Sequence, residues 1–362
     1  VEHGTCSGSH ELGNNHCGSL QKDLVLAPGE EVRLIFMLGE GNREAGKKIR
    51  EKYSDMANVD AAYAQLKDYW ENKFAQLQIK TPNEGMNTLI NTWNLYQAEV
   101  NIMFSRFASF IEVGGRTGLG YRDTAQDAMT IPHSNPEKCR QRIVELLRGL
   151  TTKGYGLHLF SPEWFDPDAK KEKKKPFKSP TVIPTVNAKD IVHGLEDACS
   201  DDALWLVPSI IEYIKETGET GFADETVTYA DGGEGRVYEH MKRILDFSAE
   251  QVGATGICKG LRADWNDCLN LNCFSEEPGE SFQTFGPSEG PNAESVFIAG
   301  MFVKYGKDYV KICRHKGLCD EADTAQKAIE QMEKTVMDAG WDGEWYLRAY
   351  DHYKHKIGSK EC

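Results

Sequence analysis

At 362 residues the chain is longer than most single hydrophobic cores allow, so one large domain or two smaller ones are expected. A formal net charge of -14, with 27% charged and 40% hydrophobic residues, is typical of a globular protein and argues against a nucleic-acid partner. No run of about eighteen apolar residues indicates a membrane span, and the opening lacks the basic and apolar regions of a signal peptide, so a cytoplasmic protein without membrane association is expected.

The first segment of the chain has the pattern of β structure. Two apolar, partly β-branched runs, residues 24–26 and 32–38, flank Pro28 and Gly29, which favour a turn. These runs predict two strands at the end of a β domain, which we place at residues 1–40. The chain starts without Met inside this pattern and stops directly after a helix-like stretch, so we expect a fragment of a longer protein.

Helical spacing follows the β segment. Between residues 42 and 77 apolar positions recur at helical intervals among charged ones, and we expect one or two linking helices within residues 41–80. From residue 81 to residue 362 helical patterns alternate with Gly-rich, polar or charged loops, which predicts an all-α domain.

Local signals place the first helices of this domain. The first buried face is marked by an apolar stripe of six residues: Leu89, Trp93, Tyr96, Val100, Phe104 and Phe107. Asn135 followed by Pro136 is typical of an N-cap and a first helical turn. The buried side of that helix is expected to be Ile143, Leu146, Leu147 and Leu150.

A later helix is expected to start at residues 200–202, where Ser-Asp-Asp supplies capping side chains, and to kink at Pro208. Further helices are expected over residues 237–252, 295–305 and 324–339. Histidines and cysteines within residues 3–17 do not match the spacing of compact zinc sites, so no metal is expected there.

A loop at residues 114–127 concentrates glycine, arginine and aspartate. Its glycines do not match the spacing of a nucleotide-binding loop. Arg116 and Arg122, with Asp123 and Asp127, could hold sugar hydroxyls and an anion by charge-assisted hydrogen bonds. The alternative is surface ion pairing with Asp123 as a helix cap, and the residue types alone leave both interpretations open.

A second loop, residues 260–268, places Trp265 between Asp264 and Asp267. A tryptophan face packs against the apolar face of a sugar ring, and a partly desolvated carboxyl can stay protonated and protonate a leaving oxygen. A capped turn around a buried tryptophan is the alternative, and both stay open. A third loop, residues 340–346, repeats the aromatic and acidic theme, and packing is the favoured interpretation there.

Three motifs gain meaning when they are read together: the runs Gly120–Asp127, Ala263–Cys268 and Gly343–Ala349. Together they resemble the glycoside hydrolase family of cellobiose and chitobiose phosphorylases, and the resemblance spans most of the chain. It implies a mainly α fold: an incomplete (α/α)6 barrel at residues 81–362, preceded by the helical linker and by the end of an N-terminal β-sandwich.

The resemblance also implies roles for individual residues. Asp267 matches the family's general acid, and Trp265 matches a residue of a sugar subsite. Arg106, Arg116 and Asp123 match residues that contact the non-reducing sugar. Arg122 matches a residue that contacts both the sugar and the phosphate. The family's other phosphate ligands lie further along than this sequence extends. Inorganic phosphate as co-substrate, no further cofactor and a homodimer are implied as well.

The activity that the resemblance implies is inverting phosphorolysis of a β-linked disaccharide. Thr124, Ala125 and the run Gly156–Phe160 are closer to the members acting on N,N'-diacetylchitobiose than to the cellobiose enzymes. Phosphate is already anionic at neutral pH, so such a site needs one carboxylic acid and a cationic seat. Three alternatives stay open: a cellobiose phosphorylase, an inverting hydrolase with Glu344 as its base, and a non-catalytic sugar-binding helical domain.

Overall fold

The computed structural model describes residues 5–6, 18–39, 41–104, 118–162, 165, 198–266 and 292–360. The chain divides into two units, Val1–Asn72 and Lys73–Cys362, each with its own internal contacts. None of the helices in these described ranges combines the length and the apolar composition needed to cross a bilayer.

The described residues of unit 1 form a turn, the helix α1 (Arg43–Tyr53) and most of the helix α2 (Met56–Phe74). Helix α1 starts where the Asn42 side chain accepts a hydrogen bond from the Ala45 amide, and α2 follows it. These two helices occupy the stretch in which the spacing of apolar residues predicted them. A bidentate ion pair between Arg33 and Asp60 ties the segment before α1 to α2.

The two strands predicted at the start of the chain are not formed. Within residues 18–39, all of which are described, the expected turn is present and the Glu30 amide donates to the Ala27 carbonyl over 3.0 Å, but the flanking runs form no strand. Their apolar side chains are exposed, Val25 by 97%. The physical reason is that two strands without a third, or without a helix to cover them, are marginal in water.

The first helical stretch of unit 2 contains α3 (Glu84–Thr88), a π-helical segment (Leu89–Asn94) and α4 (Leu95–Phe104). Its buried side consists of Leu95, Glu99 and Ile102. Three residues of the stripe predicted to be buried are exposed, namely Leu89, Trp93 and Tyr96, while Val100 is half-buried. Met86 and Met103 of the same helices are exposed as well. The prediction that Leu89, Trp93 and Tyr96 lie in the core of this chain was therefore wrong.

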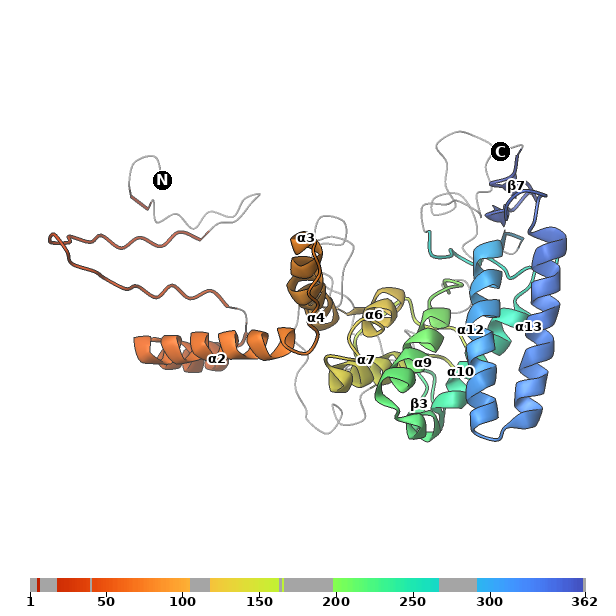
Figure 1. Ribbon diagram of the computed structural model, residues 1–362, viewed down its shortest axis with the longest axis horizontal. Helices are drawn as coiled ribbons and strands as arrows, with labels where there is room; N and C mark the ends of the chain where they lie inside the picture. Colours follow the sequence, from red (N-terminus) through yellow and green to blue (C-terminus); the bar gives the residue numbers. More distant parts are fainter. Residues whose placement is uncertain are drawn as a thin grey trace. The chain divides into compact units, whose positions relative to one another are not determined.

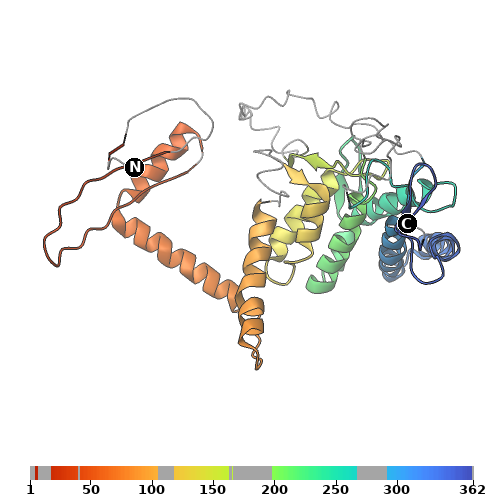
Figure 2. The ribbon, with the colours of Figure 1, turned by 90° about the horizontal axis from the view of Figure 1, so that it is seen from above.

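Four helices form the centre of unit 2: α6 (Tyr121–Ala128), α7 (Pro136–Arg148), α9 (Leu206–Thr217) and α10 (Val237–Glu250). The N-cap of α7 is confirmed, because the Asn135 side chain accepts from the Lys138 amide. Its predicted buried residues are all fully buried: Ile143, Leu146, Leu147 and Leu150. In Figures 1 and 2 the helices of unit 2 follow one another in chain order from α4 to α13.

The cap predicted at residues 200–202 is wrong. A 3-10 turn, Ala203–Trp205, leads into α9, and neither Asp202 nor Trp205 donates or accepts a capping bond through its side chain at these helix starts. Pro208 does not lie in the interior of the helix, where a kink was predicted. Because α9 begins at Leu206, Pro208 lies in its first turn, where a missing amide proton costs nothing.

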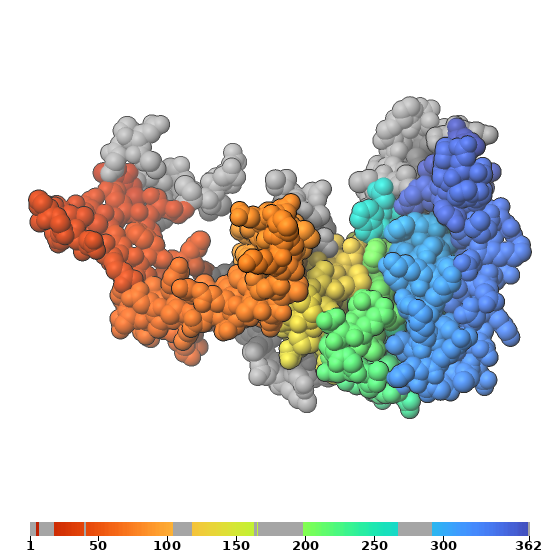
Figure 3. All heavy atoms as spheres, viewed as in Figure 1, coloured from red at the N-terminus to blue at the C-terminus, as the bar shows by residue number. Residues whose placement is uncertain are grey.

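The last two helices described in unit 2, α12 (Val296–His315) and α13 (Cys319–Ala339), are antiparallel and lie side by side (Figures 1 and 3). Ser295 caps α12 by accepting from the Ile298 amide. Both helices are longer than the sequence pattern predicted. The pattern predicted an end near Gly306, but this glycine lies where α12 meets Ile329 of α13, so it serves close packing within the helix.

Short strands fix the loops between the helices. Strand β1 (Leu119–Gly120) pairs with β2 (Leu159–Phe160), and β3 (Thr226–Thr228) pairs with β4 (Glu234–Arg236), both antiparallel. A third sheet has the order β5-β6-β7, formed by Glu294–Ser295, Ala349–Tyr350 and Lys356–Ile357. The first and third of these sheets bring residues far apart in the sequence to the site described next.

Candidate functional site

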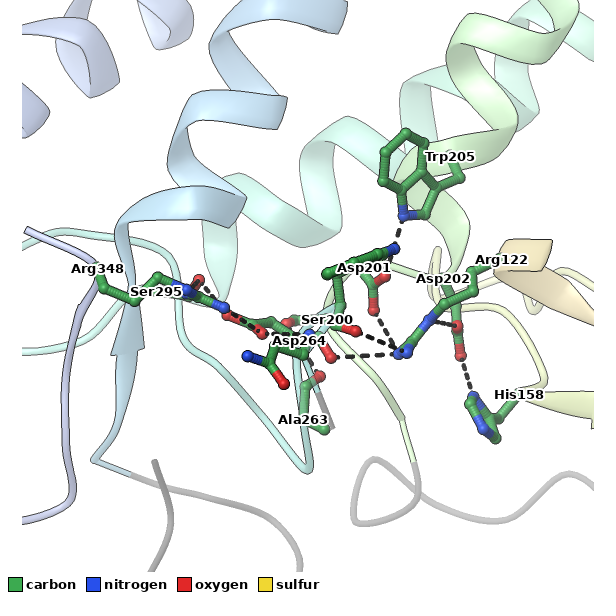
Figure 4. A network of polar contacts seen from close by, with 12 residues as sticks. Arg122, His158, Ser200, Asp201, Asp202, Trp205, Ala263, Asp264, Ser295 and Arg348 are labelled. Atoms are coloured by element: carbon green, nitrogen blue, oxygen red, sulfur yellow. Dashed lines mark hydrogen bonds and ion pairs between the residues drawn. The ribbon is translucent and has the colours of Figure 1, made fainter. Parts of the chain in front are cut away.

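The site is centred on Arg122, the second residue of α6. Strand β1 and the start of α6 place this side chain in the interior, where only 7% of the residue is exposed. Its Nη2 lies 2.8 Å from Asp201 Oδ1, and its Nε lies 3.3 Å from Asp202 Oδ1 (Figure 4). Ion pairing of Arg122 was one of the two open interpretations, but a surface location was wrong, because both aspartates are fully buried.

The two aspartates differ in protonation although they are adjacent in sequence. Burial, helped by the charge of Asp202, raises the pKa of Asp201 to about 7, and Trp205 Nε1 donates to its Oδ2 over 3.0 Å. Burial alone would raise the pKa of Asp202 as well, but His158 and Arg122 outweigh it and hold that pKa below its ordinary value. One carboxylate is therefore firmly charged, and the other titrates near neutral pH.

His158 is the second cation of this cluster. Its Nδ1 lies 3.0 Å from Asp202 Oδ2, and the charge of Asp202 and this hydrogen bond raise the pKa of the imidazole to about 11. The Tyr121 amide donates to the His158 carbonyl, and the β1–β2 pairing holds both chain segments together. The side chain is exposed, so a protonated imidazole is presented to solvent beside a buried carboxylate.

Arg122 also holds the backbone of the second loop. Its Nη1 donates to the Trp265 carbonyl over 3.2 Å, and its Nη2 donates to the Asp264 carbonyl over 3.3 Å. On the other side of this loop the Ser200 amide donates to the Ala263 carbonyl over 2.9 Å. One guanidinium thus joins the start of α6, the Asp201–Asp202 pair and the segment that leads to Asp267.

The carboxylate of Asp264 is buried, and both of its oxygens accept hydrogen bonds (Figure 4). Arg348 Nη2 and Ser295 Oγ each lie 2.7 Å from one of its two oxygens, and the Asn266 amide donates to Oδ1 over 3.0 Å. Pairing of β5 with β6 places Ser295 opposite Ala349, next to Arg348. The indole of Trp265, in contrast, is half exposed. The alternative of a capped turn around a buried tryptophan therefore fails at the tryptophan.

The structure brings together part of the predicted site. Arg122 is bonded to the backbone of Trp265, and Asp123 follows Arg122 in the first turn of α6, where Gly120 is the N-cap. Asp264, which was not among the predicted site residues, is bonded to Arg122 as well. Three predicted site residues lie outside the described residues: Asp267, Arg106 and Arg116. The group of histidines and cysteines within residues 3–17 also lies outside them, except for Cys6.

Sequence reasoning missed several members of this network. Asp201 and Asp202 were assigned to a helix cap, and His158, Ser295 and Arg348 were given no role. The adjacent acidic pair before an apolar helix carried a signal, because a cap needs only one such side chain. The partners of Asp264 gave no comparable local signal.

Among the residues that the structure describes, one group has atoms close enough to hold a metal ion. The ligand atoms of His158, Cys199 and Asp202 lie within 4.8 Å of one another. Burial raises the pKa of the Cys199 thiol, and His158 Nδ1 lies 3.0 Å from Asp202 Oδ2, so a metal would have to displace protons from His158 and Cys199. In this structure His158 and Asp202 form an ion pair.

The third loop is only partly packed. Trp341 and Tyr346 stack edge to face with ring centroids 5.0 Å apart, yet both rings remain exposed. Glu344, the candidate base of a hydrolase, is exposed and pairs with Lys360 over 3.2 Å. The packing interpretation therefore holds between the two rings and not toward the core.

Comparison with known proteins assigns both parts of the chain. The model of the glycosyl hydrolase 94 superfamily catalytic domain matches residues 69–362, and that of the glycosyl hydrolase 94 supersandwich domain matches residues 1–56. The chain is 50% identical over its whole length to an N,N'-diacetylchitobiose phosphorylase of Vibrio proteolyticus and 48% identical to one of Vibrio furnissii. A solabiose phosphorylase of Paenibacillus borealis is 26% identical over 99% of the chain and 40% of its own length.

The chain spans 43% of the length of each of the two Vibrio proteins. The resemblance found in the three motifs is thereby confirmed at the level of the family. With a helical catalytic domain over most of its length and a supersandwich segment before it, the chain belongs to the glycosyl hydrolase 94 superfamily.

Proposed function

We propose that the protein carrying this chain catalyses inverting phosphorolysis of N,N'-diacetylchitobiose to α-GlcNAc-1-phosphate and GlcNAc. The observation that carries the proposal is 50% and 48% identity along the whole chain to two proteins named for this activity. Relatives named for other disaccharides are 26% and 24% identical. The twofold gap supports diacetylchitobiose over cellobiose and related substrates.

In the proposed reaction the carboxylic acid of Asp267 gives its proton to the glycosidic oxygen, which leaves with the reducing GlcNAc. A phosphate oxygen attacks the anomeric carbon from the opposite face, so the configuration inverts. The nucleophile is an anion already, and no carboxylate base is needed. What the site must add is positive charge near the phosphate.

The described residues support a cationic binding site for the phosphate. Arg122 and His158 lie on either side of the buried Asp202 carboxylate, which raises the pKa of His158 and keeps the imidazole protonated. The exposed imidazolium of His158 can attract an anion. We assign Arg122 to the sugar and phosphate site and Trp265 to the face of a sugar ring. The proposed contacts to the non-reducing sugar are Arg106, Arg116 and Asp123.

We further propose that residues 81–362 are part of an (α/α)6 barrel, that residues 41–80 link it to the N-terminal domain, and that residues 1–40 are the end of a β-sandwich. The exposed apolar face of α3 and α4 supports the barrel. In a closed ring of helices this face would be covered by later helices. Trp93, 57% exposed here, is the largest side chain on that face.

The remaining proposals concern location, oligomeric state and cofactors. We propose a cytoplasmic homodimer with inorganic phosphate as co-substrate and no further cofactor. The net charge of -14 supports a protein that avoids nucleic acid. Dimerisation is checked by sedimentation at catalytic concentrations.

The proposed reaction is tested by incubating the protein with diacetylchitobiose, with and without phosphate, and with cellobiose under both conditions. The expected result is phosphate-dependent release of GlcNAc and its α-1-phosphate from diacetylchitobiose, with much slower turnover of cellobiose. Sugar release that ignores phosphate would instead support a hydrolase, whose base would lie about 6.5–9.5 Å from the acid. Binding of GlcNAc without any turnover would support a sugar-binding domain.

A further inference from the structure

We propose that Arg348 is a positioning residue for catalysis: with Ser295 it holds the buried carboxylate of Asp264 and thereby fixes the loop at Asp264 and Trp265, which precedes the proposed general acid in the sequence. This inference rests on the proposed function, because it takes Asp267 as the general acid. It adds a residue to the site from the last part of unit 2.

The contacts around Asp264 leave its side chain no freedom. Arg348 Nη2 bonds Oδ1 over 2.7 Å, and Ser295 Oγ bonds Oδ2 over 2.7 Å. Arg348 Nη1 also lies 3.4 Å from Ser295 Oγ, so the three side chains form a closed triangle. The side chain of Asp264 is 0% exposed and that of Arg348 only 28%. Loss of such a partner leaves a buried carboxylate uncompensated and strongly destabilises the folded protein, so Arg348 and Asp264 are expected to stay paired.

The partners of Asp264 are themselves fixed by regular structure. Ser295 belongs to β5 and caps α12, and Arg348 directly precedes β6, which pairs with β5. The Ser295 amide donates to the Cys258 carbonyl over 2.8 Å, which links β5 to the residues just before the second loop. The geometry of the triangle is therefore set by a sheet and a long helix and not by the loop itself.

Two arginines that are far apart in the sequence, Arg122 and Arg348, thus hold the loop at Asp264 and Trp265. Arg122 binds the backbone carbonyls of Asp264 and Trp265, and Arg348 binds the side chain of Asp264. Asp267 follows Asp264 by three residues in the sequence, and three residues of chain span at most about 10 Å. A displacement of about 1 Å at a reacting group can lower the rate roughly a hundredfold.

The decisive experiment replaces Arg348 by Gln and measures kcat and KM for diacetylchitobiose and phosphate separately. A positioning role predicts that kcat falls by about a hundredfold, while both KM values and the binding of GlcNAc by calorimetry change less than about twofold. Arg348→Lys keeps the charge but cannot bridge Asp264 and Ser295 in the same way, and it should show a smaller loss. Arg314→Gln, an exposed arginine on α12, is the matched control and should behave as wild type.

Coupling supplies a second readout that loss of stability alone does not reproduce. Asp264→Asn should lower kcat as Arg348→Gln does, and the double variant should be little worse than either single one. If Arg348→Gln unfolds early, Arg348→Lys and the coupling to Asp264→Asn decide the matter. A folded Arg348→Gln protein with wild-type kcat overturns the inference, and so does a raised KM for phosphate with unchanged kcat, which would make Arg348 a ligand.

The two proposals can fail separately. If Asp267→Asn keeps full turnover, or if the wild type releases sugar without phosphate, the proposed function is wrong. If Asp267→Asn is inactive and Arg348→Gln is fully active, the proposed function stands and the positioning role of Arg348 is wrong.

Discussion

The carboxylates of Asp202 and Asp264 are buried, and each is stabilised by partners of opposite charge. Asp202 lies between Arg122 and His158, and Asp264 lies against Arg348. Removing one member leaves the other charge without compensation in a low-dielectric interior, which costs about 3–5 kcal/mol. Substitutions at these positions therefore need a readout of catalysis as well as one of stability.

Asp267→Asn tests the proposed acid directly. The amide cannot give a proton to the leaving oxygen, so kcat for diacetylchitobiose is expected to fall by about 10²–10⁴, while GlcNAc binding persists. Steady-state kinetics measure kcat, and calorimetry measures the binding of GlcNAc. Asp338→Asn, an exposed aspartate on α13, serves as the control. Unchanged turnover in Asp267→Asn would remove this residue from the mechanism.

His158→Gln tests the ion pair through its pH dependence. The pKa of His158 is raised from 6.5 to about 11 by the charge and hydrogen bond of Asp202. Because the folded-state pKa lies above the unfolded one, the pair stabilises the fold fully below pH 6.5 and loses this effect as the pH rises toward 11. The variant should therefore have a lower Tm than wild type at pH 6, and the difference should shrink by pH 10.

Thermal melts at several pH values measure this difference. His315→Gln, at the exposed end of α12, is the control and should follow the wild-type curve. A gap between wild type and His158→Gln that stays constant over the whole range would contradict the assigned pairing.

At the scale of elements, close packing of α12 on α13 explains where a local signal misled. A glycine inside a helix lowers helix propensity by about 1 kcal/mol relative to Ala, yet α12 continues through both Gly300 and Gly306. At Gly306 a β-carbon would lie 2.9 Å from the Ile329 side chain, whereas at Gly300 in the same helix nothing lies within 4 Å. The two glycines therefore have different roles in one helix.

The pair Gly306→Leu and Gly300→Leu separates propensity from packing. At Gly300 the substitution should stabilise the protein by up to about 1 kcal/mol, because Leu is the better helix former. At Gly306 overpacking against α13 should destabilise it by about 1–3 kcal/mol. Urea unfolding measures both. Equal effects at the two positions would show that the helices are not in contact as described.

At the scale of the whole molecule, the outward apolar face of α3 and α4 is the feature to explain. Aromatic and long apolar side chains gather there, while the opposite side of the same helices is buried in unit 2. Apolar patches of this kind mark a surface that another element covers. The proposed barrel provides that cover.

Trp93→Ser in the full-length protein tests this. If later helices bury Trp93, the substitution should cost roughly 3 kcal/mol or more and lower the Tm clearly. Asn94→Ser, on the flank of the same face, is the control and should have little effect. Equal Tm values for Trp93→Ser and wild type would argue against closure of the ring at this face.

The sequence by itself determined the helical class, the cap and buried side of α7, and the motifs that led to the family. These features depend on neighbours a few residues apart, so periodicity and capping residues record them. Only the tertiary structure decided what the charged residues do. Arg122 and Asp201 are 79 positions apart, and Asp264 and Arg348 are 84 apart. No local pattern encodes such pairs, because they exist only where strands and helices bring the two segments together.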